Sequence, residues 1–295
     1  MILSIGEILV DMIGDNNNAY QMFIGGAPFN VAVNAKQCGA KVAFIGRVGN
    51  DVAGRFIEKS IDKFNLDYAI LQKDSIRNTT LAFVALDEFG ERDFTFFRHD
   101  TADFNIDIDE IDFNSFDNLS IVHIGSLMLN EKKGVDFARA MVKKIRKNGL
   151  LFSFDVNFRY DLYDTKEQAF RVYREFIESA DILKFSIDEI LDYTGEVTLD
   201  EAIKKVKCKG LLLITLGASG SMFYFNGQSK TVESIKVKPI DTTGAGDAFY
   251  GAVLAEIDKI AYDNLNNENL SIALKAANQK GANATLHKGA VSIEG

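Results

Sequence analysis

The strongest constraint on the fold is a glycine-containing segment near the C-terminal end, DTTGAGDAF at residues 241–249. Before it, Ile235, Val237 and Ile240 have the apolar spacing of a short strand. After it, apolar residues recur at helical spacing as far as about Asp258. The segment therefore predicts the end of a strand, a glycine turn and the first turn of a helix, which is a unit of an α/β fold.

This turn predicts an anion site. The first amides of a helix have no acceptor within the helix, so we expect the N–H groups of Gly244, Ala245 and Gly246 to be free for an anion. Asp247 follows at once and has two interpretations. It serves the helix dipole, or it is a general base beside amides that hold a transferring phosphoryl group. The segment alone leaves both interpretations open.

Composition narrows the class of protein. Lys and Arg number 33 against 42 Asp and Glu, a net charge of −9, which argues against binding to nucleic acid or to anionic membranes. No apolar run is long enough to span a membrane, and the N-terminal residues favour a strand over a signal peptide. Cys38 and Cys208 have no metal-ligand spacing, so we expect free thiols in the cytoplasm.

The rest of the chain alternates strand and helix, which predicts a mostly parallel sheet. We expect strands at 2–13, 41–48, 121–124, 151–154, 182–185 and 211–216, and a late antiparallel pair at 222–225 and 230–232. We expect helices from Pro28 to Gly39 and at 53–64, 133–147, 166–179, 187–193, 199–206 and 268–286.

Residues 77–99 interrupt this alternation. Two strands, 79–86 and 92–97, flank a turn signal at 87–90 and predict a hairpin. Joined by residues 12–24, the hairpin would form a small sheet that stands off the main body as a lid over the site.

Two long motifs together resemble one family. The chain has no G-x-x-x-x-G-K-[ST] and no third glycine of a dinucleotide fingerprint. Instead GGAPFNVA at 25–32, followed by GRVGND at 46–51 and Gly54, resembles the N-terminal signature of the ribokinase-like (PfkB) carbohydrate kinases, and 241–249 resembles their C-terminal signature. The resemblance covers the whole chain. It implies one α/β domain, residues 1–295: a three-layer sandwich with a central mostly parallel sheet and a small β lid.

The resemblance also implies roles for particular residues. Asp247 resembles the catalytic base, and Gly244, Ala245 and Gly246 resemble the anion hole for the γ-phosphate of ATP. Sugar hydroxyls would meet a carboxylate, a glycine pair and an amide, which are those of Asp11, Gly25, Gly26 and Asn30. The alternative for Asp11 and Asn30 is a polar residue in a surface turn.

Nucleotide and metal positions follow in the same way. The nucleotide would contact Ser186, Thr215, Gly217, Gly220, Ala277, Asn278 and Gly281, although a plain amphipathic helix also explains the last three. Glu189 matches the element that organises Mg²⁺, often through water, with Ser186 in place of the family's Asn. A monovalent cation such as K⁺ would lie near Asp241, Thr243, Gly289 and Ser292.

Two further segments resemble the fructokinase branch, GERDFTFFR at 90–98 and DVNFRYDLY at 155–163. They would place Arg98, Asn157 and Arg159 near the sugar, and alternation along the strand would put Arg98 on one face with Phe94 and Phe96. The alternative for Arg98 is a solvated charge that protects a sheet edge. We therefore expect ATP-dependent phosphorylation of the 6-hydroxyl of D-fructose.

Two alternatives stay open. The same arginines occur in 2-keto-3-deoxygluconate kinases, where they meet a carboxylate, and a noncatalytic sugar-sensing protein on a kinase fold is a different class. The phenylalanines of the hairpin exceed what a thin lid can bury, so we expect a homodimer through the lid: Phe83, Phe94, Phe96 and Phe97.

Overall fold

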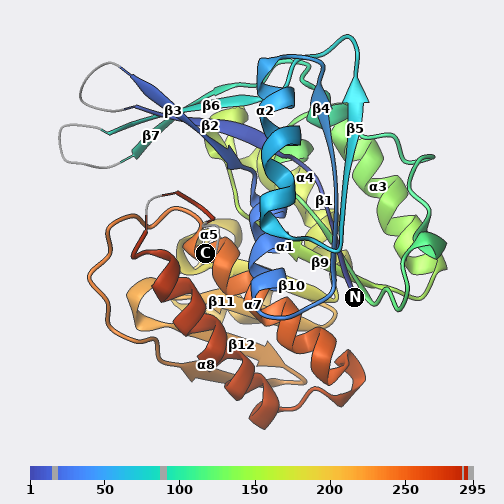
Figure 1. The fold of residues 1–295 in the computed structure, drawn as a ribbon. Coiled ribbons are helices and arrows are strands. Elements are labelled where there is room, and N and C mark those ends of the chain that lie inside the picture. The colour runs from blue at the N-terminus through green and yellow to red at the C-terminus, as the bar shows by residue number, and fades with distance from the viewer. Residues whose placement is uncertain (15–18, 87–91, 288, 292–295) are drawn as a thin grey trace.

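The structure is a computed structural model that describes residues 1–14, 19–86, 92–287 and 289–291. Two sheets organise these residues (Figure 1). The larger sheet runs through the body between two layers of helices, and the smaller sheet projects from it at the upper left of the view.

The larger sheet has, within the described residues, nine strands in the order β13-β12-β11-β10-β9-β8-β1-β4-β5. All neighbours are parallel except β11–β12 and β12–β13. Its strands are β1 (Ile2–Ile5), β4 (Val42–Gly49), β5 (Tyr68–Asp74), β8 (Ile121–Ile124), β9 (Leu151–Asp155), β10 (Ile182–Ser186), β11 (Leu211–Thr215), β12 (Ser221–Phe225) and β13 (Gln228–Val232). The expected mostly parallel sheet is confirmed, and the carboxyl ends of its central strands share one edge.

Apolar side chains alternate between the two faces of this sheet and make two cores. Leu3, Ile5 and Phe154 lie in the core beneath α3 to α6, whereas Ile2 and Phe44 lie in the core beneath α1, α2, α7 and α8. The helices are α1 (Ala27–Gln37), α2 (Val52–Ile61), α3 (Lys132–Lys147), α4 (Lys166–Ser179), α5 (Ile187–Thr194), α6 (Leu199–Lys205), α7 (Ala245–Ile260) and α8 (Asn267–Ala284). Helix, sheet and helix form the three layers that the family resemblance implies.

The smaller sheet contains four strands within the described residues, in the order β3-β2-β6-β7. They are β2 (Leu9–Gly14), β3 (Tyr20–Gly25), β6 (Leu81–Leu86) and β7 (Arg92–Phe97). The predicted hairpin pairs in antiparallel register and joins the N-terminal segment through the parallel pair β2–β6. Its predicted turn at 87–90 falls outside the described residues.

Two strand predictions were wrong, and one strand was missed. The single strand expected at 2–13 breaks at residues 6–8, because β1 belongs to the larger sheet and β2 to the smaller one. No strand forms between 233 and 240, where Ile240 donates its amide to Thr285 O instead of to a neighbouring strand. The edge strand β5 was missed because its first three residues are exposed and carry no alternating pattern.

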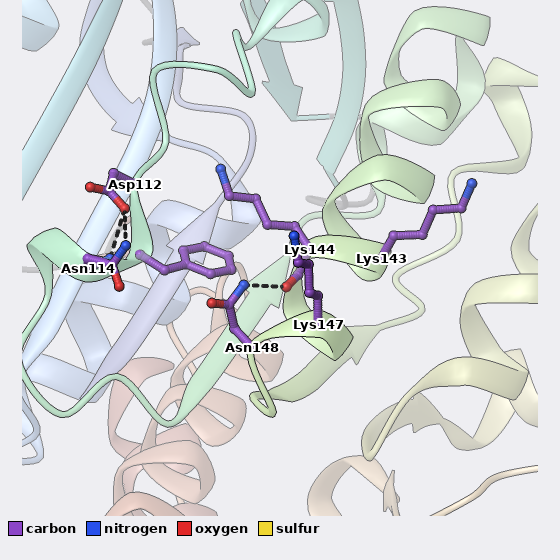
Figure 2. A pocket seen from close by; sticks show the side chains of 7 residues that line it. Asp112, Asn114, Lys143, Lys144, Lys147 and Asn148 are labelled. Carbon is purple, nitrogen blue, oxygen red and sulfur yellow. Dashed lines mark hydrogen bonds between the residues drawn. The ribbon is translucent and has the colours of Figure 1, made fainter.

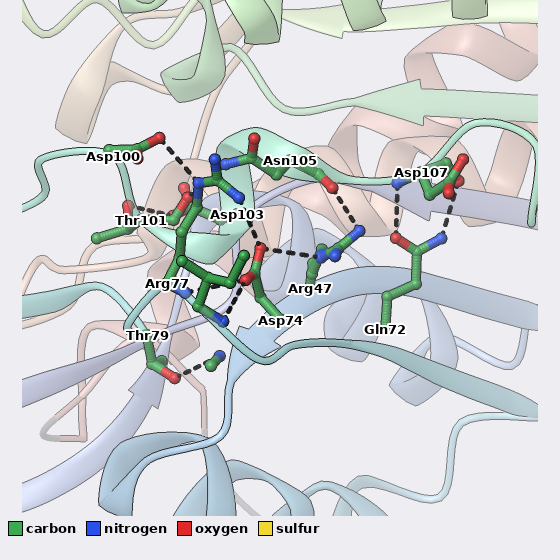
Figure 3. Close-up of polar contacts among 12 residues, drawn as sticks. Arg47, Gln72, Asp74, Arg77, Thr79, Asp100, Thr101, Asp103, Asn105 and Asp107 are labelled. Carbon is green, nitrogen blue, oxygen red and sulfur yellow. Dashed lines mark hydrogen bonds and ion pairs between the residues drawn. The ribbon is translucent and has the colours of Figure 1, made fainter.

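A polar network fastens the base of the smaller sheet to the body (Figure 3). Asp74, at the end of β5, accepts the amides of Ile76 and Arg77 at 2.9 Å each and faces the guanidinium groups of Arg47 and Arg77 at 3.4 Å. Arg77 also pairs with Asp100 at 2.9 Å. These contacts hold together the two segments that lead into and out of the hairpin.

Candidate active site

The glycine turn before α7 is built as the sequence predicts, with one exception. Gly244 has φ 75°, and a Cβ there would lie 2.6 Å from Ala290 O, so both conformation and space require glycine. Among the described residues, no acceptor meets the amides of Gly244 and Gly246. The amide of Ala245 is not free, because it donates to Thr242 O at 3.3 Å and closes the turn. The expectation of three free donors is corrected to two.

Asp247 lies in the first turn of α7 and contacts the N-terminal half of the chain. Its Oδ2 accepts Nδ2 of Asn30 at 2.8 Å. The residue is half-buried, and the partial loss of water around its carboxylate raises the pKa of Asp247. The hydrogen bond from Asn30 and the positive charges of Lys184 and Arg159 oppose this rise. A carboxylate with a raised pKa at a helix N-terminus has the properties of a general base.

The segment around Gly25 and Gly26 brings a second carboxylate toward this point. A Cβ at Gly25 would lie 2.3 Å from Oδ2 of Asp11, so the carboxylate of Asp11 covers that glycine directly. Gly26 has φ 114°, lies against Glu7 O and begins α1, the helix that carries Asn30. Asn30 is buried, and its Oδ1 has no hydrogen-bond partner among the described residues. A polar ligand between Asp11 and Asn30 would meet acceptors from both side chains.

A buried ion pair lies below the glycine turn. Nζ of Lys184 on β10 donates to both carboxylate oxygens of Asp155 on β9, at 2.8 and 2.9 Å. Burial raises the pKa of Asp155 to about 6, although the ammonium opposes the rise. The sequence analysis gave neither residue a role. A lysine between apolar residues of a central strand was the signal that could have found the pair.

The predicted nucleotide residues lie along β11 and α8. Thr215 ends β11, and Gly217 and Gly220 have φ 59° and 109° in the turn that follows. Asn278 donates Nδ2 to Val232 O at 2.8 Å, which ties α8 to the end of β13. Two small residues of α8 serve packing: Ala277 is fully buried in the core, and Gly281 lets α8 approach Ala245 and Phe249.

Ser186 and Glu189 form a capping box at the start of α5. The Oγ of Ser186 accepts the amide of Glu189, which explains why serine can stand here, and Oε2 of Glu189 accepts the amide of Ser186 at 2.7 Å. Its Oε1 accepts the amide of Phe158 at 2.9 Å. Each oxygen retains a lone pair, so Glu189 can hold a metal-bound water. Among the described residues, no group of three His, Cys, Asp or Glu side chains could hold a metal alone.

Three of the four predicted monovalent-cation residues lie together. Asp241 accepts the amides of Thr243 and Gly289, at 2.9 and 2.7 Å. The contact with Gly289 ties the loop before the glycine turn to the loop after α8. Ser292 falls outside the described residues.

The three residues predicted to lie near the sugar have different surroundings. Asn157 has φ 38° and lies two residues after the end of β9. The positive charge of Arg159, two residues further on, acts on Asp247. Arg98 is buried just beyond β7, where it pairs with Asp103 and donates to Leu127 O and to Asn130 Oδ1. Its guanidinium also lies 3.7 Å from the centre of the Phe104 ring. The described contacts of Arg98 therefore fasten the base of the smaller sheet. The side chain of Phe94 falls outside the description.

A surface hollow lies beside the C-terminal end of α3 (Figure 2). Lysines line it, and the ammonium of Lys144 already donates to the backbone oxygens of Ile108 and Ile111. The hollow lies at the end of α3 that precedes β9, hence at the amino edge of the sheet. Asp155 and Ser186 lie at the opposite, carboxyl edge, where ligands bind in open α/β sheets.

The fold and the site together define a class. A carboxylate beside two open amides, at a helix N-terminus on the carboxyl edge of a parallel sheet, is arranged for group transfer between a phosphate and a hydroxyl. No described helix has the length and apolar character needed to cross a membrane.

Comparison with known proteins identifies the family. The model of the pfkB family carbohydrate kinases matches residues 1–294, and the chain belongs to that family. A fructokinase of Vibrio alginolyticus is 34% identical over 289 residues, covering 97% of this chain and 93% of the relative.

Solved structures agree. The fructokinase of Xylella fastidiosa with bound ATP superposes with a TM-score of 0.88 at 28% identity, covering 98% of this chain and 93% of that one. A double mutant of the fructokinase from Vibrio cholerae O395, in fructose, ADP and potassium ion bound form, gives 0.87 at 34% identity with coverage of 98% and 93%. The expected family is confirmed.

Proposed function

We propose that this kinase transfers the γ-phosphoryl group of ATP to the 6-hydroxyl of D-fructose, with Asp247 as the general base. The observation that carries the proposal is the hydrogen bond between Asp247 and Asn30. It joins the glycine turn, which suits a phosphate, to the segment after Gly25 and Gly26, which suits a polyol. The relatives named above as fructokinases support the choice of sugar.

The reaction uses these groups as follows. Asp247 takes the proton of the 6-hydroxyl while the oxygen of that hydroxyl forms a bond to the γ-phosphorus. The bond from the γ-phosphorus to the bridging oxygen of ADP breaks at the same time. The free amides of Gly244 and Gly246 stabilise the charge on the transferring group. Asp11 and Asn30 orient the sugar hydroxyls, and Asn157 and Arg159 complete the sugar side. Closure of the smaller sheet excludes water, which limits ATP hydrolysis.

Two metal ions belong to this proposal. Mg²⁺, held on the phosphates with Glu189 reached through water, would neutralise phosphate charge. A monovalent cation beside Asp241, Thr243 and Gly289 would stabilise the loop that carries the glycine turn, with Ser292 as a further ligand. A potassium ion in the related Vibrio cholerae structure supports this cation. The nucleotide would lie along Thr215, Gly217, Gly220 and the α8 residues Ala277, Asn278 and Gly281, with Ser186 beside its phosphates.

The alternative substrate is an acid sugar such as 2-keto-3-deoxygluconate. In that case Arg159 and Arg98 would meet a carboxylate. The contacts of Arg98 with Asp103, Leu127 and Asn130 favour the neutral sugar, because they use donors from all three guanidinium nitrogens. A noncatalytic sugar-sensing protein is disfavoured, since Asp247 and both glycines of the turn are present.

A panel of sugars with ATP tests the proposal. We expect fructose to be phosphorylated with the highest kcat/KM, and phosphorus NMR of the product to place the phosphate on the primary 6-oxygen. Phosphorylation of 2-keto-3-deoxygluconate but not of fructose would contradict the choice of sugar. Sugar binding by calorimetry without turnover on any member of the panel would favour the sensing protein.

We further propose that the chain is one domain with a β lid, acts in the cytoplasm and dimerises through that lid. On the smaller sheet the side chains of Tyr20 and Phe97 are more than half exposed. Each ring makes an edge-to-face contact with the ring of Phe83, and the ring centres are 5.1 Å apart in both pairs. Phe96 packs inward with Leu9, Ala82 and Leu127 and does not contribute. Sedimentation should give a dimer at micromolar concentration that Phe97→Asp dissociates, and a monomeric parent protein would refute the dimer.

A further inference from the structure

The buried pair of Lys184 and Asp155 is a weak source of stability for its position in the core. Both side chains are only 6% exposed. They stand opposite each other in the register of the parallel strands β9 and β10, in the middle of the larger sheet. Removing two charges from water costs several kcal/mol, roughly, which their attraction often fails to recover. Apolar residues of similar volume would pack the same space at no such cost.

The position of the ammonium indicates a use for it. A Cβ at Gly246 would lie 3.6 Å from Nζ of Lys184 and 3.8 Å from its Cε. Apart from the chain neighbours of Gly246 and the backbone of α7 itself, no other described atom comes within 4 Å of that point. The positive charge therefore lies directly beneath the second glycine of the turn. That glycine has one of the two open amides, and the residue after it is Asp247.

The other charges around these groups are also known. Asp247 faces Asn30 on α1, Lys184 on β10 and Arg159 after β9. Through Coulomb interaction it also faces the carboxyl groups of Glu7 after β1 and Asp155 on β9. Lys184 faces Asp155, Glu189 and Asp247. The charge of Lys184 also acts on His123 on β8. Burial lowers the pKa of His123 to about 3, so its side chain is neutral at physiological pH. Lys184 and Arg159 are thus the two cations that oppose the desolvation of Asp247.

We propose that Lys184 is a positioning residue for phosphoryl transfer, which holds Asp247 ionised and sets a fixed positive charge beneath the amides that receive the phosphoryl group. Asp155 keeps the ammonium charged and aligned. Lys184 neither gives nor takes a proton in the step, so the balance of the reaction is unchanged. The inference rests on the proposed function, because it needs Asp247 to act as the base.

The experiment compares pH profiles of kcat/KM for the wild type, Lys184→Met and the double variant Asp155→Asn with Lys184→Met. The double variant leaves no unpaired buried charge, so it separates catalysis from folding. Ser153→Ala is the matched control, because it removes a buried polar group on β9 that contacts His123 and Tyr250 but carries no charge. The substrate is the sugar that the panel identifies, and circular dichroism reports the fold of each variant.

We expect the double variant to fold and to lose about 10²-fold in kcat/KM at pH 7, the size of effect typical of one preorganised electrostatic group. The acid limb of Lys184→Met should move to higher pH, because loss of a nearby positive charge raises the pKa of Asp247. The double variant should show a smaller shift in the same direction, because it also loses the negative charge of Asp155, which interacts with Asp247. Ser153→Ala should lower the melting temperature without moving that limb.

A folded double variant with the wild-type rate and acid limb would overturn the inference. So would failure of both Lys184 variants to fold, which would make the pair a structural requirement. Asp247→Ala, measured in parallel, keeps the two proposals apart. If Asp247→Ala stays active, the proposed role of Asp247 as the base fails; if it is inactive while the double variant is unaffected, only the role of Lys184 fails.

Discussion

The carboxylates of the active site and those at the base of the smaller sheet are treated in opposite ways. At the site, burial raises the pKa of Glu7 to about 8 and that of Asp155 to about 6. One oxygen of Glu7 has no hydrogen-bond partner among the described residues. At the base, burial also acts to raise the pKa of Asp74, but the amides of Arg77 and Ile76 and the charge of Arg47 outweigh it and lower that pKa.

The difference lies in the number of donors and not in burial. Asp74 is only 2% exposed, yet amides and guanidinium groups replace the water that it loses. Asp247 is half-buried and receives one side-chain hydrogen bond, from Asn30. A carboxylate whose oxygens all receive hydrogen bonds from the protein stabilises the fold. A carboxylate with fewer hydrogen-bond donors around it can accept a proton or bind a ligand.

The largest effect is expected at the site. Asp247→Ala should lower kcat by at least ~10²-fold, the usual contribution of a general base, with the melting temperature little changed. In the wild type, kcat/KM should fall as the pH drops through the pKa of Asp247, which lies above the ordinary value of 3.8. Steady-state rates across pH check both expectations, and an unchanged kcat in the variant would remove Asp247 from the mechanism.

Asp74→Ala should lower the stability of the protein and leave its kcat unchanged, the reverse of what is expected for Asp247→Ala. Losing the acceptor for two amides and the partner of two arginines should cost about 2–4 kcal/mol of unfolding free energy, while the folded enzyme keeps its kcat. Urea denaturation and steady-state kinetics give the two numbers. Asp74→Asn, which retains one oxygen for the amides, is the control and should cost roughly half as much.

The wild type should show the corresponding pH dependence. The pKa of Asp74 is lower in the folded protein than its ordinary 3.8. This carboxylate therefore adds stability that is present above pH 3.8 and is lost as the pH falls through the folded pKa. A loss of kcat in Asp74→Ala without a loss of stability would break the comparison.

Glu7→Gln should change stability in a pH-dependent way. The folded pKa of about 8 exceeds the ordinary 4.5, so the folded protein binds the proton more tightly. Stability from this group is complete below pH 4.5 and is lost as the pH rises toward 8. Glutamine does not titrate, so the stability of the variant should rise relative to that of the wild type by roughly 3–4 kcal/mol between pH 5 and pH 8. A difference in unfolding free energy between the two proteins that is the same at pH 5 and at pH 8 would refute this prediction.

The smallest effect is expected at an exposed carboxylate. Asp136 on α3 pairs with Lys132, and both side chains are more than half exposed. Asp136→Ala should change the unfolding free energy by no more than about 0.5 kcal/mol, because solvent and salt screen such pairs. A cost as large as that of Asp74→Ala would mean that donor number does not separate structural carboxylates from solvated ones.

The sequence by itself determined the local units. Period-2 and helical patterns located β8 at 121–124 and α4 at 166–179 at their observed bounds, and the glycines and Asp247 of the 241–249 segment located the turn and the helix it begins. These features depend on neighbours within a few residues, and so a chain read in order displays them. The two signatures added the family, which fixed the order of the layers.

Only the tertiary structure decided which segments, far apart in the sequence, contact each other. Pairing between sheets divided residues 2–13, left 233–240 without a partner strand and gave β5 its place at an edge. Contacts between distant segments enclosed Arg98 among Asp103, Leu127 and Asn130, and set Lys184 beneath Gly246. Burial and charge at a point depend on every segment that packs there, and no local pattern contains that sum.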